Sequence, residues 1–162
     1  MSIFTLAKKI SLGALILAWP TLALANIGDT LADLRQRYGS AQDLGGQMLF
    51  EVRIINGQIV PARGSADTQD HFTVTVYFDG VHSAMETFTR NTSDPVKANM
   101  AQPDIDAILS AASEGQQWRS IQVPTGRTTW ARGDNKLIAR FSPNKSGKAD
   151  DASVLVIMLN TN

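Results

Sequence analysis

Apolar and polar residues alternate most strictly in the segment HFTVTVYFDGVHSAMETFTR, residues 71–90. Every second residue from Phe72 to Phe78 is apolar, whereas the residues between them are two threonines and a tyrosine. This period of two predicts a strand that buries one face. Asp79–Gly80 is a strong signal for a tight turn, so we expect a second antiparallel strand to follow directly.

The predicted turn sets the register of this hairpin. With Asp79–Gly80 as the two turn residues, Tyr77 lies opposite His82 and Thr73 lies opposite Glu86. Both pairs fall on the face that alternates with the buried residues. We therefore expect an open sheet face that carries Tyr77, His82 and Glu86.

The segment DTLADLRQRYG repeats its apolar side chains at helical spacing. Leu31, Leu34 and Tyr38 stand at positions i, i+3 and i+7, which is typical of one face of a helix. Asp29 and Thr30 are both suited to cap the first turn, and Gly39 suits the left-handed residue that follows a helix. These signals predict a helix with both ends marked.

The segment PDIDAILSAASEG predicts a second helix. Pro103 fits its first turn, because the backbone N–H that proline lacks has no partner there. Ile105, Ile108, Leu109 and Ala112 form a single apolar stripe. The stripe predicts that this helix also packs on a core.

Further segments read as strands. Asn56–Gly57 predicts a two-residue hairpin turn after an alternating stretch. The run ASVLVIMLN is continuously apolar, so we expect a strand that is covered on both faces. The other predicted strands lie at residues 47–55, 58–63, 117–123, 127–132 and 136–141.

The order of these elements is a helix, several strands, a second helix and several strands. It predicts an α+β fold: an antiparallel sheet with the two helices packed on one face. The order also indicates a weak tandem repeat, with half-repeats at about residues 26–95 and 96–162. Residues 26–162 are long enough for a single domain with a core of its own.

The N-terminal residues predict export. Lys8 and Lys9 precede an apolar run, and Ala23-Leu24-Ala25 gives the small-x-small pattern that signal peptidases cleave. The run is shorter than the roughly 20 residues of a membrane-spanning helix. We therefore expect residues 1–25 to be a cleaved signal peptide and the protein to lie in a bacterial periplasm or in the medium, with no membrane anchor.

The net charge and the absence of cysteine argue against several classes of function. Removal of Lys8 and Lys9 changes the balance of 15 Lys+Arg and 15 Asp+Glu to 13 against 15. A net charge of −2 gives no reason to expect binding to nucleic acid or to an anionic membrane. The chain has no cysteine, which excludes a lipoprotein anchor, disulfides and cysteine ligands for zinc.

Candidate catalytic groups are few. The two histidines, His71 and His82, are predicted on neighbouring strands, and no third ligand completes a metal site with them. No Gly-x-Ser-x-Gly elbow and no glycine-rich phosphate loop occurs. We therefore expect no catalytic, cofactor or metal site.

The tripeptide Arg132-Gly133-Asp134 is interpreted as a hairpin corner, because Gly and Asp are common turn residues.

A binding face is the remaining candidate site. Tyr77 and His82 are predicted on the open face, and Trp130, Arg132 and Arg140 share a face if the loop between their strands has three residues. Exposed tryptophan and arginine are typical of binding hot spots. With a loop of two or four residues, Trp130 instead shares a face of the sheet with Leu137. We favour the interpretation that Trp130 is a core residue.

Three motifs suggest a family resemblance. Gly-Asp-Thr-x-x-x-Leu-x-x-Arg-Tyr-Gly at residues 28–39 and Val-x-Phe-Asp-Gly-Val at residues 76–81 resemble small exported bacterial proteins with tandem helix-then-strands units. Among these are the SmpA/OmlA-type assembly lipoproteins and the β-lactamase inhibitory proteins. Residues 130–135 resemble a Trp-x-Arg-x-Asp-Gly hairpin of uncharacterised secreted proteins, with Asn135 in place of the last glycine. The resemblance implies protein binding, although the lipid-bearing cysteine is absent.

The sequence thus leads to three hypotheses about function. The favoured one is an exported, non-catalytic protein-binding module whose open sheet face or hairpin tips contact another envelope or secreted protein. The alternative is a small periplasmic hydrolase or ligand carrier with a site near His71 and His82. A third is a self-associating envelope component.

Overall fold

The computed structural model describes residues 27–62, 70–122, 127–146, 148 and 152–161. The predicted signal peptide at residues 1–25 lies outside them. Within the described part, no helix is both long enough and apolar enough to cross a membrane. The elements are α1 (Leu31–Tyr38), β1 (Ala41–Asp43), β2 (Gln47–Ile55), β3 (Gln58–Pro61), β4 (Asp70–Asp79), β5 (His82–Thr92), the 3-10 turn η2 (Pro95–Lys97), α2 (Gln102–Ala111), β6 (Trp118–Ile121), β7 (Thr128–Arg132), β8 (Leu137–Ser142) and β9 (Val154–Leu159).

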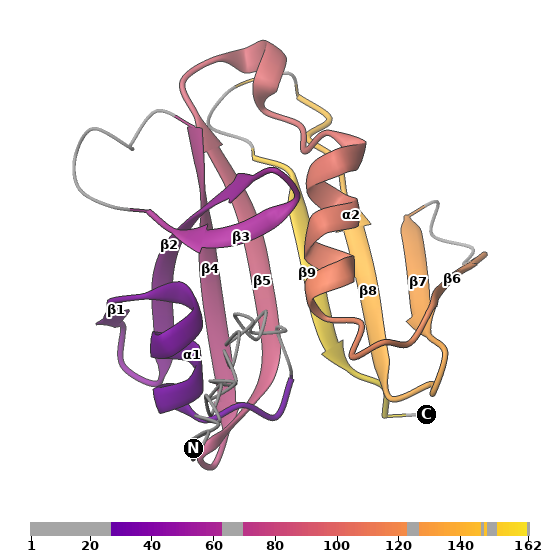
Figure 1. Cartoon of the computed structure of the whole chain (residues 1–162). Coiled ribbons are helices and arrows are strands. Elements are labelled where there is room, and N and C mark those ends of the chain that lie inside the picture. The colour runs from indigo at the N-terminus through magenta and orange to yellow at the C-terminus, as the bar shows by residue number, and fades with distance from the viewer. Residues whose placement is uncertain (1–26, 63–69, 123–126, 147, 149–151, 162) are drawn as a thin grey trace, which may run out of the picture.

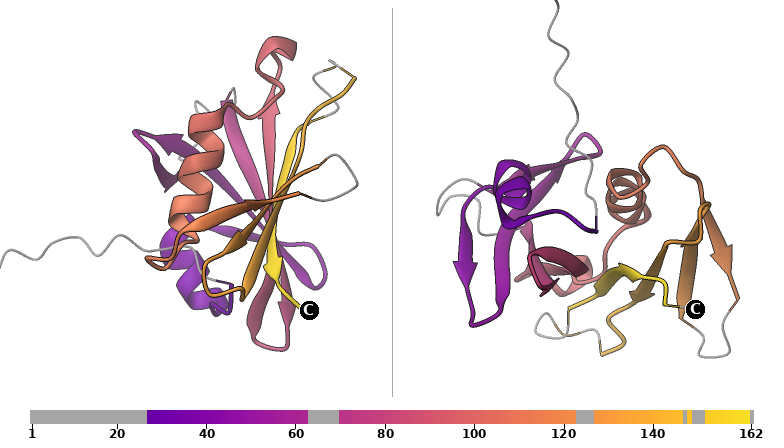
Figure 2. Two further views of the ribbon diagram at one scale, coloured as in Figure 1. Left: turned by 90° about the vertical axis from the view of Figure 1, so that its right-hand side faces the viewer. Right: turned by 90° about the horizontal axis from the view of Figure 1, so that it is seen from below.

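The strands form one antiparallel sheet. Eight of them follow the order β1-β2-β4-β5-β9-β8-β7-β6, and β3 pairs with β2 (Figure 1). The strands cross one another at an angle, as in any twisted sheet (Figure 2). The α+β class is therefore confirmed. The packing of both helices on one face and the tandem repeat stay predictions.

Helix α1 has the predicted caps. The Thr30 hydroxyl accepts a hydrogen bond from the Asp33 backbone N–H, and the Asp33 carboxylate accepts one from the Thr30 N–H at 3.0 Å. Gly39 ends the helix with a φ of 87°. Leu34 and Tyr38 are buried, so the predicted apolar face points into the core.

Helix α2 is tied to the sheet at its start. The Asp104 carboxylate accepts a hydrogen bond from the Ala101 backbone N–H at 3.1 Å, which satisfies one donor of the first turn. The same carboxylate forms an ion pair with Arg90 of β5 at 2.6 Å. The apolar stripe of the helix is buried, as predicted.

Both helices and the inward-facing strand residues contribute to one core. The buried cluster is Leu34, Tyr38, Phe50, Val52, Phe72, Val74, Val76, Phe88, Met100, Ile105, Ile108, Leu109, Ala112, Leu137, Ala139, Leu155 and Ile157. Tyr38 meets the rings of Phe50 and Phe88 edge to face, with centroids at 5.5 and 6.4 Å. Aromatic pairs in this geometry add to the stabilisation from burial alone.

The register predicted for the β4–β5 hairpin is wrong. Asp79 pairs with His82, so Gly80 and Val81 are the turn residues, and Gly80 supplies the positive φ that such a turn requires. A bulge then shifts the pairing between Tyr77 and Phe78. The bulge places one extra residue on β5. Every later residue of β5 therefore points its side chain to the face opposite the predicted one, because side chains alternate with a period of two.

The shift reverses the expected position of Glu86. Tyr77 lies opposite Met85 instead of His82, and Thr73 lies opposite Thr89. Glu86 pairs with Val76 on the core side and is only 1% exposed. The carboxylate expected on the open face is therefore inside the protein.

Strand β9 also differs from its prediction. It lies between β5 and β8, where Leu155 and Ile157 are fully buried. Val154, Val156 and Met158, which alternate with them, are only half-buried. The strand is thus central in the sheet but covered on one face, so its continuous apolar run places apolar side chains on the open face.

Candidate functional site

The open face of the sheet consists of the side chains that alternate with the core. One row runs from Tyr77 through Met85 to Met158, because these residues are successive cross-strand partners. It ends on β8 at Ile138, which is buried. The row beside it contains Thr75, Thr87, Val156 and Arg140. Apart from Ile138, these residues are half-buried or exposed. The first row is mostly apolar, although it lies on the side of the sheet away from the core.

The structure does not bring the five proposed binding residues together. Tyr77 and Arg140 lie on the open face, in neighbouring rows. His82 lies at the tip of the β4–β5 hairpin, directly after the turn. Trp130 and Arg132 lie on the core side, since Trp130 pairs with Ala139 of the core cluster.

Trp130 and Arg132 have structural surroundings. Trp130 is partly buried and packs against the core cluster, so it lies on the core side of the sheet and not on the open face. Arg132 is 2% exposed, and its Nη1 donates a hydrogen bond to the Ala112 carbonyl at 3.2 Å, at the end of α2. The guanidinium also forms ion pairs with Glu114 at 3.1 Å and with Asp134 at 2.9 Å.

The Arg-Gly-Asp tripeptide is a corner, as predicted. Ala131 pairs with Ile138, so the loop between β7 and β8 has four residues. The Asp134 carboxylate accepts hydrogen bonds from the Arg132 side chain and from the Lys136 backbone N–H. These bonds lower the pKa of Asp134. The arginine at the end of β7 and the aspartate of the loop are therefore bound to each other.

The two histidines lie at opposite ends of the β4–β5 hairpin. His71 pairs with Asn91, nine residues beyond His82 on β5, which corresponds to roughly 30 Å of strand. His82 forms a hydrogen bond through Nδ1 with the Gly28 carbonyl at 2.8 Å. No group of three or more His, Asp or Glu among the described residues could hold a metal ion. The two histidines do not form a joint site.

A buried polar cluster fixes α1 on the sheet. The Tyr38 hydroxyl donates a hydrogen bond to Glu86 Oε2 at 2.9 Å, and Arg37 lies over the Tyr38 ring at 5.4 Å and pairs with Asp29. Burial raises the pKa of the Glu86 carboxyl from 4.5 to about 7, although the Tyr38 bond and the Arg37 charge lower it. This cluster was missed because the bulge was not foreseen. Counting back from Phe88 with a period of two would have placed Glu86 inside.

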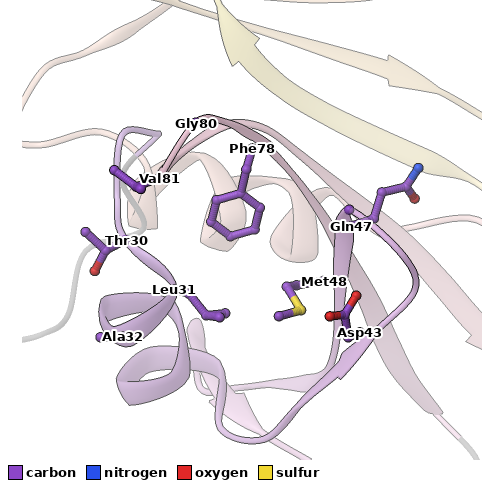
Figure 3. A pocket seen from close by; sticks show the side chains of 10 residues that line it. Thr30, Leu31, Ala32, Asp43, Gln47, Met48, Phe78, Gly80 and Val81 are labelled. Carbon is purple, nitrogen blue, oxygen red and sulfur yellow. The ribbon is translucent and has the colours of Figure 1, made fainter.

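A pocket of about 630 Å³ opens beside this helix (Figure 3). Its walls come from the first turn of α1, the β1–β2 connection and the tip of the β4–β5 hairpin. Leu31, Met48 and Phe78 surround the hollow, and the Asp43 carboxylate lies beside Met48. The lining residues are Thr30, Leu31, Ala32, Asp43, Gly46, Gln47, Met48, Phe78, Gly80 and Val81.

No protein-family model, curated protein or solved structure matches this chain. The resemblance to exported assembly lipoproteins and inhibitory proteins therefore stays a prediction.

Proposed function

We propose that the chain is an exported, non-catalytic protein-binding module that binds another envelope or secreted protein through the open face of its sheet. The observation that carries this proposal is the half-buried apolar row formed by Tyr77, Met85 and Met158. As part of this proposal, both helices cover the opposite face of the sheet. Their buried residues belong to the same core cluster as the inward-facing strand residues.

The composition of the open face supports protein binding. An antiparallel sheet that faces water on one side normally carries polar residues there. Here Val154, Val156 and Met158 of the central strand β9 share that face with Tyr77. Aromatic residues and methionine are enriched at the centres of protein interfaces, and the threonines of β4 and β5 supply a polar border.

Export is part of the same proposal. The basic residues Lys8 and Lys9, the apolar run and the Ala23-Leu24-Ala25 pattern support a cleaved signal peptide. A mature chain without cysteine suits a periplasm or the medium. The partner would then be a protein of the envelope or of the surroundings of the cell.

Site-specific photo-crosslinking in the producing cells tests the proposed face. Benzoylphenylalanine at Tyr77 and, separately, at Met158 should crosslink the same protein, because both residues lie in one row. The same group at Gln36, an exposed residue of α1, should not. Tyr77→Ala should weaken binding of the captured partner at least about tenfold, as expected for an aromatic residue at the centre of an interface.

The crosslinking result separates this proposal from its competitors. An adduct of twice the mass of the chain would replace the proposal with self-association. Equal adducts from Gln36 and Tyr77, or no adduct from a folded Tyr77 variant, would contradict the sheet face as the binding surface.

A small-ligand carrier is the second candidate. The observation that favours it is the pocket, whose volume of about 630 Å³ falls within the range of small-molecule sites. His82 follows Val81 of the lining, whereas His71 is at the far end of the hairpin. The carrier hypothesis therefore concerns His82 and the pocket alone.

A further inference from the structure

We propose that the pocket at the tip of the β4–β5 hairpin is a second binding site, for an extended protein segment that presents an apolar side chain next to a lysine or arginine. The pocket includes α1 residues and Phe78, which packs against the core, so it lies on the core side of the sheet. The open sheet face lies on the other side. The two sites are tested by separate experiments, so a negative result for one leaves the proposal for the other unchanged.

The inside of the pocket is suited to an apolar side chain. Leu31, Met48 and Phe78 surround the hollow, and all three also pack against the core cluster, which holds them in place. Methionine adapts its shape to different partners because its side chain is unbranched and flexible. A large apolar side chain that enters this space leaves water and gains contact on several sides.

Exposed apolar residues continue beyond the pocket. Val81 lines it and is 71% exposed, and Leu44, in the connection between Asp43 and Gly46, is 49% exposed. Val81 belongs to the lining, and Leu44 follows the lining residue Asp43 in the chain, so both add exposed apolar area near the hollow. A ligand that runs across both residues is longer than a single buried group, which favours an extended segment of chain over a small molecule.

Charge around the pocket favours a cationic neighbour. Asp43 lines the pocket, and Asp33 and Asp79 directly adjoin the lining residues Ala32 and Gly80. The lining contains no lysine or arginine. The Asp33 carboxylate bonds to Thr30 and interacts with the charges of Arg37 and His82, whereas Asp43 and Asp79 form no ion pair within the described part of the chain. Their negative potential therefore attracts a basic group that lies beside the apolar anchor.

The walls are held before a ligand arrives. The Gly28 backbone N–H donates to the Ser83 carbonyl at 2.7 Å, and the Ser83 N–H donates to the Asp29 carbonyl at 2.8 Å. These bonds join the start of α1 to the hairpin, and the Tyr38–Glu86 bond fixes the other end of the helix. A pocket that needs little ordering retains more of its binding energy.

Three short blocked peptides test the proposal on the isotope-labelled exported chain by NMR titration. Their sequences are Gly-Lys-Phe-Lys-Gly, Gly-Glu-Phe-Glu-Gly and Gly-Lys-Ala-Lys-Gly. The first should bind about tenfold more tightly than the second, since two exposed charge pairs change sign. It should shift the resonances of Leu31, Met48 and Val81, and the third peptide should leave them in place. Hexylammonium should bind more weakly than the first peptide.

Variants localise the effect. Asp43→Asn and Asp79→Asn should each weaken the first peptide about threefold. Asp106→Asn, which removes an exposed carboxylate from α2, is the matched control and should change nothing. Val81→Lys should abolish binding while the fold is kept, because this side chain is mostly exposed.

Several results would overturn the proposal. These are equal binding of the lysine and glutamate peptides, shifts that map to the open sheet face, or no binding by any peptide. Binding of hexylammonium as tight as that of the first peptide would make the pocket a small-ligand site instead. A successful crosslink at Tyr77 together with any of these results would leave the function of the sheet face intact.

Discussion

Glu86→Gln should stabilise the folded chain by about 3 kcal/mol at pH 8 and by less than about 1 kcal/mol at pH 5. Burial raises the pKa of the Glu86 carboxyl from 4.5 to about 7, and each pKa unit corresponds to about 1.4 kcal/mol. Between these two values the unfolded chain is ionised and the folded chain is protonated, so stability falls as the pH rises. Above about pH 7 the full cost of a buried charge is present, and glutamine removes it.

Urea unfolding of both proteins at pH 5 and pH 8 measures this effect. The difference between the two pH values isolates Glu86, because the other titrating groups are common to both chains. The glutamine that replaces Glu86 keeps an oxygen that accepts the Tyr38 hydrogen bond, so the contact with α1 is retained. A stability difference that is the same at both pH values would show that the Glu86 carboxyl has an ordinary pKa in the folded protein.

Arg132→Ala should lower the free energy of unfolding by about 2 to 3 kcal/mol. It removes a side chain that is 2% exposed and leaves the Ala112 carbonyl at the end of α2 without its donor. Asp134 and Glu114 lose their cationic partner at the same time, although both are partly exposed and contribute less. Thermal and urea unfolding of the variant measure the loss.

Arg140→Ala is the matched control. It removes an arginine that is exposed on the open face, so the expected change in stability is within about 0.5 kcal/mol. The pair of variants distinguishes a structural arginine from a surface one. Equal stability of the two variants would contradict a stabilising role for the contacts of Arg132 with Ala112, Glu114 and Asp134.

Local signals in the sequence were enough to predict the helices and several turns. Thr30 and Gly39 mark the ends of α1, because the cap of a helix depends on only a few neighbouring residues. Asn56–Gly57 forms the predicted turn between β2 and β3, since both residues adopt positive φ. The α+β class followed from the order of such segments.

Register and site could not be predicted in the same way. A bulge depends on how two strands meet, and the Asp79–Gly80 signal gives no indication of the extra residue on β5. The resulting shift buried Glu86, and the four-residue loop placed Trp130 on the core side. The pocket joins residues from α1, β2 and the β4–β5 hairpin, which are brought together only by the complete fold.

The position of β9 in the sheet has a consequence for how the chain acquires its structure. β5 pairs with β9 over Met85–Thr89 and Val154–Met158, so about 70 residues separate the partners. β8 uses the other edge of the same strand. Until β9 is available, both neighbours present unpaired backbone groups, which are templates for association with other chains. Pairing between strands that lie far apart in the sequence is slow. The edges of β5 and β8 at the centre of the sheet therefore stay open to association with other chains for longest while the new chain folds.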